Sequence, residues 1–440
     1  MLSIYTAKAQ NADTTKQGTS FNLRQCIDYA MQHQPALLNS QLNQTITKTN
    51  NSIALAGLLP QVNASGNAIH YIQQSGNSAF VQPNTNNGNG TGVATKTGQN
   101  SYTFLPTLSA SQQIFNPSLL YAAKSAPLYI KQSQQATDST KINIVSTVSK
   151  TFYNLLLTLE QINVLKEDTA RLEKNVQDTY HQYKGGIVDE TDYEEATITL
   201  NNSLAQLKQA NENVVPQYAA LKQVMGFPAN QQFNVSFDTT EMIRNMGIDT
   251  LQQLQYEKRI EFQELNTEKT LQHQTTEYYH YSFIPTVSAF FNYNFSMGDS
   301  HLSGIFNNGY PTSLVGLSFS MPIFTGFSRL NNIRKSKLEE EVLSNYETNL
   351  KSQIYTEYTT ALANYKSNLY NLRELQKNVV MAKRVYFVVT LQYKQGVVAY
   401  LNVITAESNL ITSEINYINA LFQLLSSKID LEKSMGIINY

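Results

Sequence analysis

Residues 182–188, Gln-Tyr-Lys-Gly-Gly-Ile-Val, recur at residues 392–398 as Gln-Tyr-Lys-Gln-Gly-Val-Val. Each copy ends a long run of apolar residues at helical spacing, and each is followed after about forty residues by Met-Gly, at Met225-Gly226 and Met435-Gly436. Upstream, Leu-Pro-Gln-Val at residues 59–62 is echoed by Ile-Pro-Thr-Val at residues 284–287. We therefore predict two tandem copies of one architecture, in which the chain reverses direction at two glycine turns, residues 183–191 and 393–401.

Composition limits the classes of function. Only 15% of the 440 residues are charged, against about a quarter in an average protein, and the net charge of −1 gives no electrostatic case for binding nucleic acid. No run approaches the roughly eighteen apolar residues of a spanning helix, so any insertion into a membrane must use strands. The single cysteine, Cys26, excludes an internal disulfide and a cysteine-based zinc site.

No motif in the sequence predicts catalysis. Neither a nucleophile elbow nor a phosphate-binding loop is present. His273 and His280 share a predicted helix face but have no carboxylate or cysteine at metal-ligand spacing. We expect a protein that is not an enzyme and that binds neither a metal nor a cofactor.

The first 20 residues have two interpretations. Ala7-Lys8-Ala9 has the small-x-small form of a signal-peptidase site, but the stretch before it is too short for a charged start and an apolar core. We expect the tail of an export signal; the alternative is an ordinary polar N-terminus.

Two segments have the alternation of strands. Residues 61–115 and 286–324 each predict a hairpin of long strands, joined by Gly- and Asn-rich loops at residues 73–100 and 297–311.

Tilted strands of about ten residues are long enough to cross a bilayer. Four strands cannot close a barrel, since the smallest membrane barrels have about eight, so several chains would pool their strands. The alternative, the edge of a soluble β-sandwich, is disfavoured by the continuous polar stripe. The side chains that we expect to face lipid are Tyr102, Phe104, Leu108, Phe291, Tyr293, Phe295, Leu317 and Phe319.

Helical spacing returns after each hairpin. Residues 117–182 and 327–392 each predict a helix of about 66 residues, roughly 99 Å long. The first return helix, residues 192–225, covers only about half that length. We expect residues 249–283 to continue it end to end, and the N-terminal helix before Pro60 to continue the second return helix.

These lengths give the domain boundaries. The first repeat would span residues 21–226 and the second residues 248–440, with an irregular equatorial segment at residues 227–247. Pro127 and Pro216 are expected to kink or end their helices. The predicted fold class is mainly α-helical with a membrane β part, built on long coiled-coil helices.

Several stretches resemble one family. The chain resembles the TolC family of outer membrane efflux proteins, with the matching stretches in the same order over nearly its whole length. These stretches are residues 21–30 followed by Gln34-Pro35-Ala36-Leu37, the Leu-Leu-Pro-Gln at residues 58–61, and residues 393–396 with Tyr400 to Glu407. The resemblance implies a homotrimer in the outer membrane, with a twelve-stranded barrel continued by a helical tunnel across the periplasm. It also implies a passive exit duct for small toxic compounds or secreted proteins, which docks a periplasmic adaptor and an inner-membrane pump of the RND or ABC type.

The resemblance assigns roles to the glycine turns. They would form the periplasmic tip and meet the adaptor, although the glycines have the simpler interpretation of ending helices. The expected docking residues are Gly186, Ile187, Val188, Gly396, Val397 and Val398.

The expected entrance departs from the family pattern. Asn402 and Thr405 stand where the family has an acidic pair, whereas the first repeat has Asp192 and Glu195 at the corresponding places. Those acids would make a mouth that favours cations, or they simply complement a helix dipole. Tyr393 matches a tyrosine that latches the closed tip in the family, and Tyr183 is its counterpart in the first repeat.

A second class of function stays open at this point. A secreted filament protein of the flagellin type also combines long polar helices with few charges. The strand pattern, present at equal places in both repeats, discriminates against it.

Overall fold

The structure is a computed structural model that describes residues 20–72, 102–236, 246–249, 253–307 and 309–439. The chain forms two compact units, each assembled from separate stretches of sequence. Unit 1 comprises residues 1–43, 133–266 and 345–440, and unit 2 comprises residues 44–132 and 267–344. The predicted loop at residues 73–100 and the expected export signal before residue 20 lie outside the described residues.

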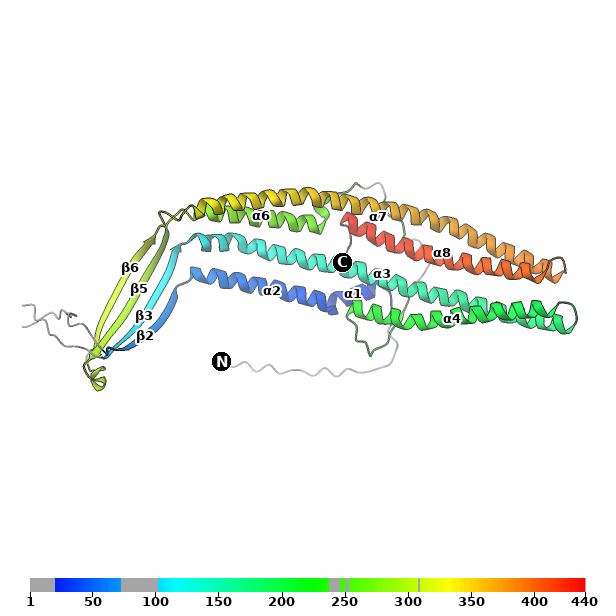
Figure 1. The fold of residues 1–440 in the computed structure, drawn as a ribbon, viewed down its shortest axis with the longest axis horizontal. Coiled ribbons are helices and arrows are strands. Elements are labelled where there is room, and N and C mark those ends of the chain that lie inside the picture. The colour runs from blue at the N-terminus through cyan, green and yellow to red at the C-terminus, as the bar shows by residue number, and fades with distance from the viewer. Residues whose placement is uncertain (1–19, 73–101, 237–245, 250–252, 308, 440) are drawn as a thin grey trace, which may run out of the picture. The chain divides into compact units, whose positions relative to one another are not determined.

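Unit 2 contains a four-stranded antiparallel sheet (Figure 1). Its strands are β2 (Gln61–His70), β3 (Tyr102–Phe115), β5 (Thr286–Asp299) and β6 (Gly309–Ser320), in the order β2-β3-β5-β6. The two predicted hairpins are therefore joined through β3 and β5, with Leu108 opposite Tyr293. The second loop is shorter than predicted, because β5 extends to Asp299 and β6 begins at Gly309, with a 3-10 turn at Leu302–Gly304 between them.

Four helices contribute residues to both units: α2 (Pro35–Leu55), α3 (Pro117–Lys184), α6 (Ile260–Tyr281) and α7 (Ser328–Lys394). A 3-10 turn at Ala56–Leu58 follows α2 and precedes β2. The predicted long helices are thus confirmed as 68 and 67 residues in α3 and α7. Pro127 lies inside α3 and Pro216 inside α4, so neither ends its helix; of the two expected effects, a kink or an end, the second is wrong. Each helix continues past its proline although a proline in a helix interior costs about 3 kcal/mol.

Unit 1 adds α1 (Leu23–His33), α4 (Glu190–Met225), α8 (Tyr400–Met435), a 3-10 turn at Tyr256–Lys258 and a two-residue parallel pairing of β1 (Ser20–Phe21) with β4 (Asn234–Val235). Asn22 starts α1 with a capping box, since its side chain accepts from the Gln25 amide and the Gln25 side chain accepts from the Asn22 amide. Pro35 begins α2 at the position where its missing N–H is not needed. The core of the unit comes mainly from α3, α4, α7 and α8, with Cys26 and Ala30 of α1. It includes Phe152, Leu155, Leu221, Tyr365, Leu424 and Leu431.

The shorter helices meet differently from the prediction. A Cβ built on Gly226, at the end of α4, would lie 2.7 Å from the His33 carbonyl oxygen, so α4 abuts the junction of α1 and α2. A Cβ on Gly436, at the end of α8, would lie 2.6 Å from the Lys258 carbonyl oxygen, just before α6. Each return helix therefore meets the short helix of its own repeat, and the expected exchange between repeats is wrong. Helix lengths alone could not decide this, because both short helices have a suitable length.

Candidate functional site at the helix tips

The two glycine turns have the same backbone geometry. At the first, the Gly186 amide donates to the Tyr183 carbonyl at 3.0 Å and the Ile187 amide donates to the Gln182 carbonyl at 2.9 Å. At the second, Gly396 and Val397 donate to Tyr393 and Gln392, both at 2.9 Å. Both pairs form a Schellman motif, in which the glycine takes a positive φ of 70°. The repeated sequence thus encodes a repeated turn.

The apolar side chains of these turns point to the surface. Ile187 is 76% exposed and Val397 is 69% exposed, whereas Val188 and Val398 are half-buried. A Cβ built on Gly186 or Gly396 would have no atom within 4 Å. The turn glycines are therefore required for their backbone conformation, and they leave the apolar tips uncovered.

A hydrogen bond joins the tips of the two repeats. The Tyr393 hydroxyl at the end of α7 donates to Gln182 Oε1 at the end of α3, at 2.5 Å. Burial, followed by the charge of Asp192, raises the pKa of Tyr393. Tyr183 does not make the equivalent contact; its ring stacks on Tyr193 of α4 with centroids 6.3 Å apart. The two predicted gate tyrosines thus have different partners.

Asp192 and Glu195 lie in the first two turns of α4, and Asn402 and Thr405 lie in the first two turns of α8. Burial, together with neighbouring Asp189, raises the pKa of Asp192, while Glu195 is exposed. Asn402 donates to the Ala399 carbonyl at 3.3 Å and Thr405 to the Leu401 carbonyl at 2.8 Å. Both side chains of the second repeat therefore bond to their own helix, and the acidic side chains lie only on the first repeat.

Sequence reasoning missed a series of polar contacts between α3 and α8. Asn143 accepts from Lys433 at 2.8 Å, Lys150 pairs with Asp430, Gln161 donates to Asn419 at 3.1 Å, and Asn175 donates to Glu407 at 3.0 Å. The order is antiparallel, so the contacts run along both helices. A signal was present at Asp168, an acid between Leu165 and Leu172 on a buried helix face.

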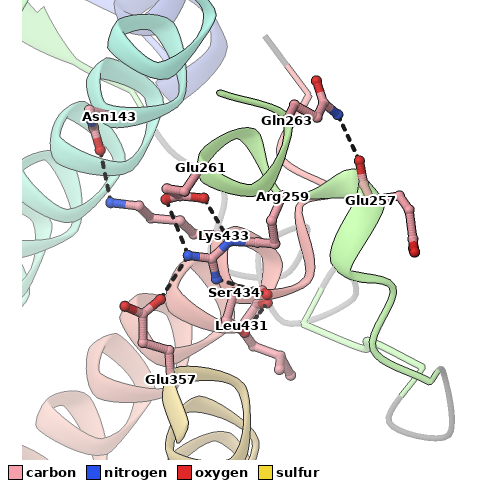
Figure 2. Close-up of polar contacts among 9 residues, drawn as sticks. All are labelled: Asn143, Glu257, Arg259, Glu261, Gln263, Glu357, Leu431, Lys433 and Ser434. Carbon is pink, nitrogen blue, oxygen red and sulfur yellow. Dashed lines mark hydrogen bonds and ion pairs between the residues drawn. The ribbon is translucent and has the colours of Figure 1, made fainter. Parts of the chain in front are cut away.

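A second polar cluster fixes the end of α8 (Figure 2). The buried Arg259 donates from Nη1 to the Ser434 carbonyl at 3.0 Å and from Nη2 to Glu357 Oε2 at 2.7 Å, and its Nε lies 3.0 Å from Glu261 Oε2. The carboxylates raise the pKa of Arg259 against the effect of its burial. This arginine ties the segment before α6 to both α7 and α8.

The sheet register gathers the predicted lipid-facing side chains. Residues opposite each other on neighbouring strands share a face, and Leu108 pairs with Tyr293, Phe291 with Val315, and Val287 with Phe319. Continuing this alternation puts all eight predicted residues on one face. The most exposed of them are Leu317 at 59% and Phe319 at 69%.

In the part of the chain that the structure describes, none of the helices combines the length and apolarity needed to cross a membrane. Within the same residues, no group of three or more His, Cys, Asp or Glu side chains is arranged to hold a metal ion.

Known proteins are similar to this chain over nearly its whole length. A family model described as "Outer membrane efflux protein" matches residues 26–227 and 263–437. The outer membrane protein VceC of Vibrio cholerae has a TM-score of 0.73 at 15% identity, covering 94% of this chain and 96% of its own. The CmeC outer membrane channel of Campylobacter jejuni has a TM-score of 0.74 at 19% identity, covering 99% of this chain and 93% of its own. The open-state MtrE outer membrane channel of Neisseria gonorrhoeae has a TM-score of 0.70 at 19% identity, covering 99% of this chain and 98% of its own. At these identities the structural likeness is one of fold.

Proposed function

This chain belongs to the outer membrane efflux protein family, and we propose that it is the exit duct of a tripartite efflux or type I secretion system. It works as a homotrimer. Four strands from each copy form a twelve-stranded barrel in the outer membrane, and the helices continue it as a tunnel across the periplasm. A periplasmic adaptor and an inner-membrane pump complete the assembly, and the duct itself is passive.

The observation that carries this proposal is the open sheet. β2 is exposed along its whole length and β6 along nearly all of it, and among the described residues neither has a further strand on its outer side. One face is apolar and exposed, and four strands are too few to close on themselves. Pairing β2 of one copy with β6 of the next satisfies both edges and directs the apolar face to lipid.

Exposed apolar side chains on α2 and α7 support the trimer independently. Several of them recur at steps of three or four, which a neighbouring copy would cover. On α2 these are Leu38, Leu42 and Ile46, and on α7 they are Leu338, Val342 and Tyr346 and then Met381, Val385, Val388 and Leu391.

The adaptor would dock on the tips. Both turns present one strongly exposed aliphatic side chain, Ile187 or Val397, on a Schellman turn of identical geometry. A single type of adaptor hairpin fits both. The acids Asp192 and Glu195 of the first repeat would make the mouth attractive to cations, since their counterparts Asn402 and Thr405 carry no charge.

Membrane fractionation followed by bilayer recording tests the proposal. We expect heat-modifiable trimers that are extracted only by detergent and that give single-channel conductance. A water-soluble polymer without a membrane fraction would instead identify a filament protein and reject the duct.

A further inference from the structure

A buried cluster of two acids and one arginine joins the first repeat to the second. Asp168 and Arg171 lie on α3, and Glu407 lies on α8. The two acidic residues are 0% and 1% exposed. Arg171 Nη2 lies 3.4 Å from Asp168 Oδ1, and Arg171 Nε lies 3.7 Å from Glu407 Oε1. One guanidinium therefore serves two carboxyl groups.

Hydrogen bonds satisfy only part of the cluster. The Ser203 hydroxyl donates to Asp168 Oδ2 at 2.7 Å, and Asn175 Nδ2 donates to Glu407 Oε2 at 3.0 Å. Among the described residues, Glu407 Oε1 and Arg171 Nε have no hydrogen-bond partner. With both acids ionised, the cluster would hold one uncompensated negative charge away from water, which is costly unless a proton neutralises it.

The groups around Glu407 reach it from three helices. Asp168 and Arg171 face it from α3, Tyr386 from α7, and Tyr400 from its own helix α8. Glu414, which pairs with Lys383 of α7 at 2.9 Å, adds negative charge beside Asp168. Burial and then the charge of Asp168 raise the pKa of Glu407 to about 7, against the opposing effects of Arg171, Asn175 and Tyr386. Burial also raises the pKa of Asp168.

We propose that Glu407 is a proton-binding site through which pH sets how firmly α8 is held against α3 near the tips. The folded state retains the proton up to a higher pH than the unfolded chain does. The cluster therefore contributes its full stability at acidic pH and loses it as the pH rises towards 7. When Glu407 is deprotonated, α8 is held less firmly against α3 near the tips. The inference goes beyond transport as such, and it rests on the proposed duct only for the meaning of the tip as an entrance.

Difference infrared spectroscopy of the detergent-solubilised full chain tests the proton site directly. Between about pH 5.5 and about pH 8.5 we expect loss of a carboxylic-acid C=O band, with a midpoint well above that of an ordinary glutamate. Glu407→Gln should remove this band. Glu173→Gln, at an exposed position on α3 near Arg171, is the matched control and should retain it. A wild-type band that survives in Glu407→Gln would overturn the proposal.

Asp168→Asn provides a second test that does not alter Glu407 itself. It removes the neighbouring charge and keeps an oxygen to accept from Ser203, so the midpoint of the Glu407 band should move to lower pH. An unchanged midpoint would contradict the coupling.

The pH dependence of the unfolding equilibrium tests whether deprotonation of Glu407 weakens the hold of α8 against α3. We expect the wild-type unfolding constant to rise by up to about tenfold per pH unit between roughly pH 5 and pH 7 relative to Glu407→Gln, with hydrogen exchange faster in α8 near Glu407 at the higher pH. Parallel curves for the two proteins would reject the proposal. These readouts need no conductance, so a protein that conducts but fails them refutes only the proton site.

Discussion

Gly226 and Gly436 differ from Gly186 and Gly396, although all four have φ between 68° and 70°. The tip glycines have open space where a Cβ would stand, whereas Gly226 and Gly436 lie against backbone carbonyl oxygens. The first pair is restricted by conformation alone. The second pair is restricted by conformation and by the close approach of another helix.

Alanine substitutions should separate these two restrictions. Gly396→Ala should cost about 1–2 kcal/mol for the left-handed backbone alone. Gly436→Ala should lower the Tm of the solubilised protein considerably more, because the backbone at Lys258 must also move. Gly247→Ala, which meets no atom within 4 Å, is the control. Equal Tm values for Gly396→Ala and Gly436→Ala would show that the close contact has no energetic effect.

Arg259 provides a second test at the level of one residue. Arg259→Met should destabilise the fold by about 2 kcal/mol, because the Ser434 carbonyl and two carboxylates lose a charged donor. The partly exposed carboxylates can rehydrate, which limits the loss. Denaturant unfolding measures it, and hydrogen exchange should be faster in the last turn of α8. Arg24→Met on the exposed side of α1 should change neither; no difference between the two variants would contradict the role of Arg259.

At the scale of elements, the sheet places chemically different residues on adjacent positions of one strand. Leu317 lies on the apolar face and Ser318 on the opposite face of β6, and both are exposed. Leu317→Arg should reduce the stability of the inserted protein by about 2 kcal/mol if that face meets lipid. Ser318→Arg is the control. The yield of folded trimer in the outer membrane decides between them, and equal yields would mean that the apolar face does not contact lipid.

How far the sequence predicts these elements depends on the range of the interactions. The strands and the long helices follow from the local period of apolar residues, and the turns at Gly186 and Gly396 follow from a repeated heptapeptide. The pairing of β3 with β5 and the contact of Gly436 with Lys258 join segments distant in sequence, which no local pattern encodes. Pro216 does not end α4, because tertiary context can override the low helix propensity of proline.

The candidate site was predictable only in part. The tip residues come from the repeat and the resemblance, both of which are readable from one sequence. The cluster at Arg171 was not found, because its acids lie 239 positions apart, at 168 and 407, on helices of different repeats. An isolated charge on an apolar helix face marks such a position, yet it does not identify the partner.

At the scale of the whole molecule, assembly should depend on the exposed apolar positions of α7. Val342→Glu puts a charge where a neighbouring copy would pack and should shift the protein from trimer to monomer in light-scattering measurements. Gln376→Glu adds the same charge at a polar exposed position of α7 and should leave the trimer intact. A trimer that survives Val342→Glu would mean that another surface makes the contact.

The meeting points at Gly226 and Gly436 also determine how force passes along the protein. α3 and α7 are unbroken peptide chains, so a twist applied at either glycine turn travels along them through covalent bonds. α4 and α8 instead end against other segments, α4 at the junction of α1 and α2 and α8 at the segment before α6. Torque in α4 or α8 has no such covalent path into the short helix beyond it. At the end of α8 it would first have to break the hydrogen bond that Arg259 donates to the Ser434 carbonyl, so this contact, and not the peptide chain, limits how far a partner at the tips can turn α8.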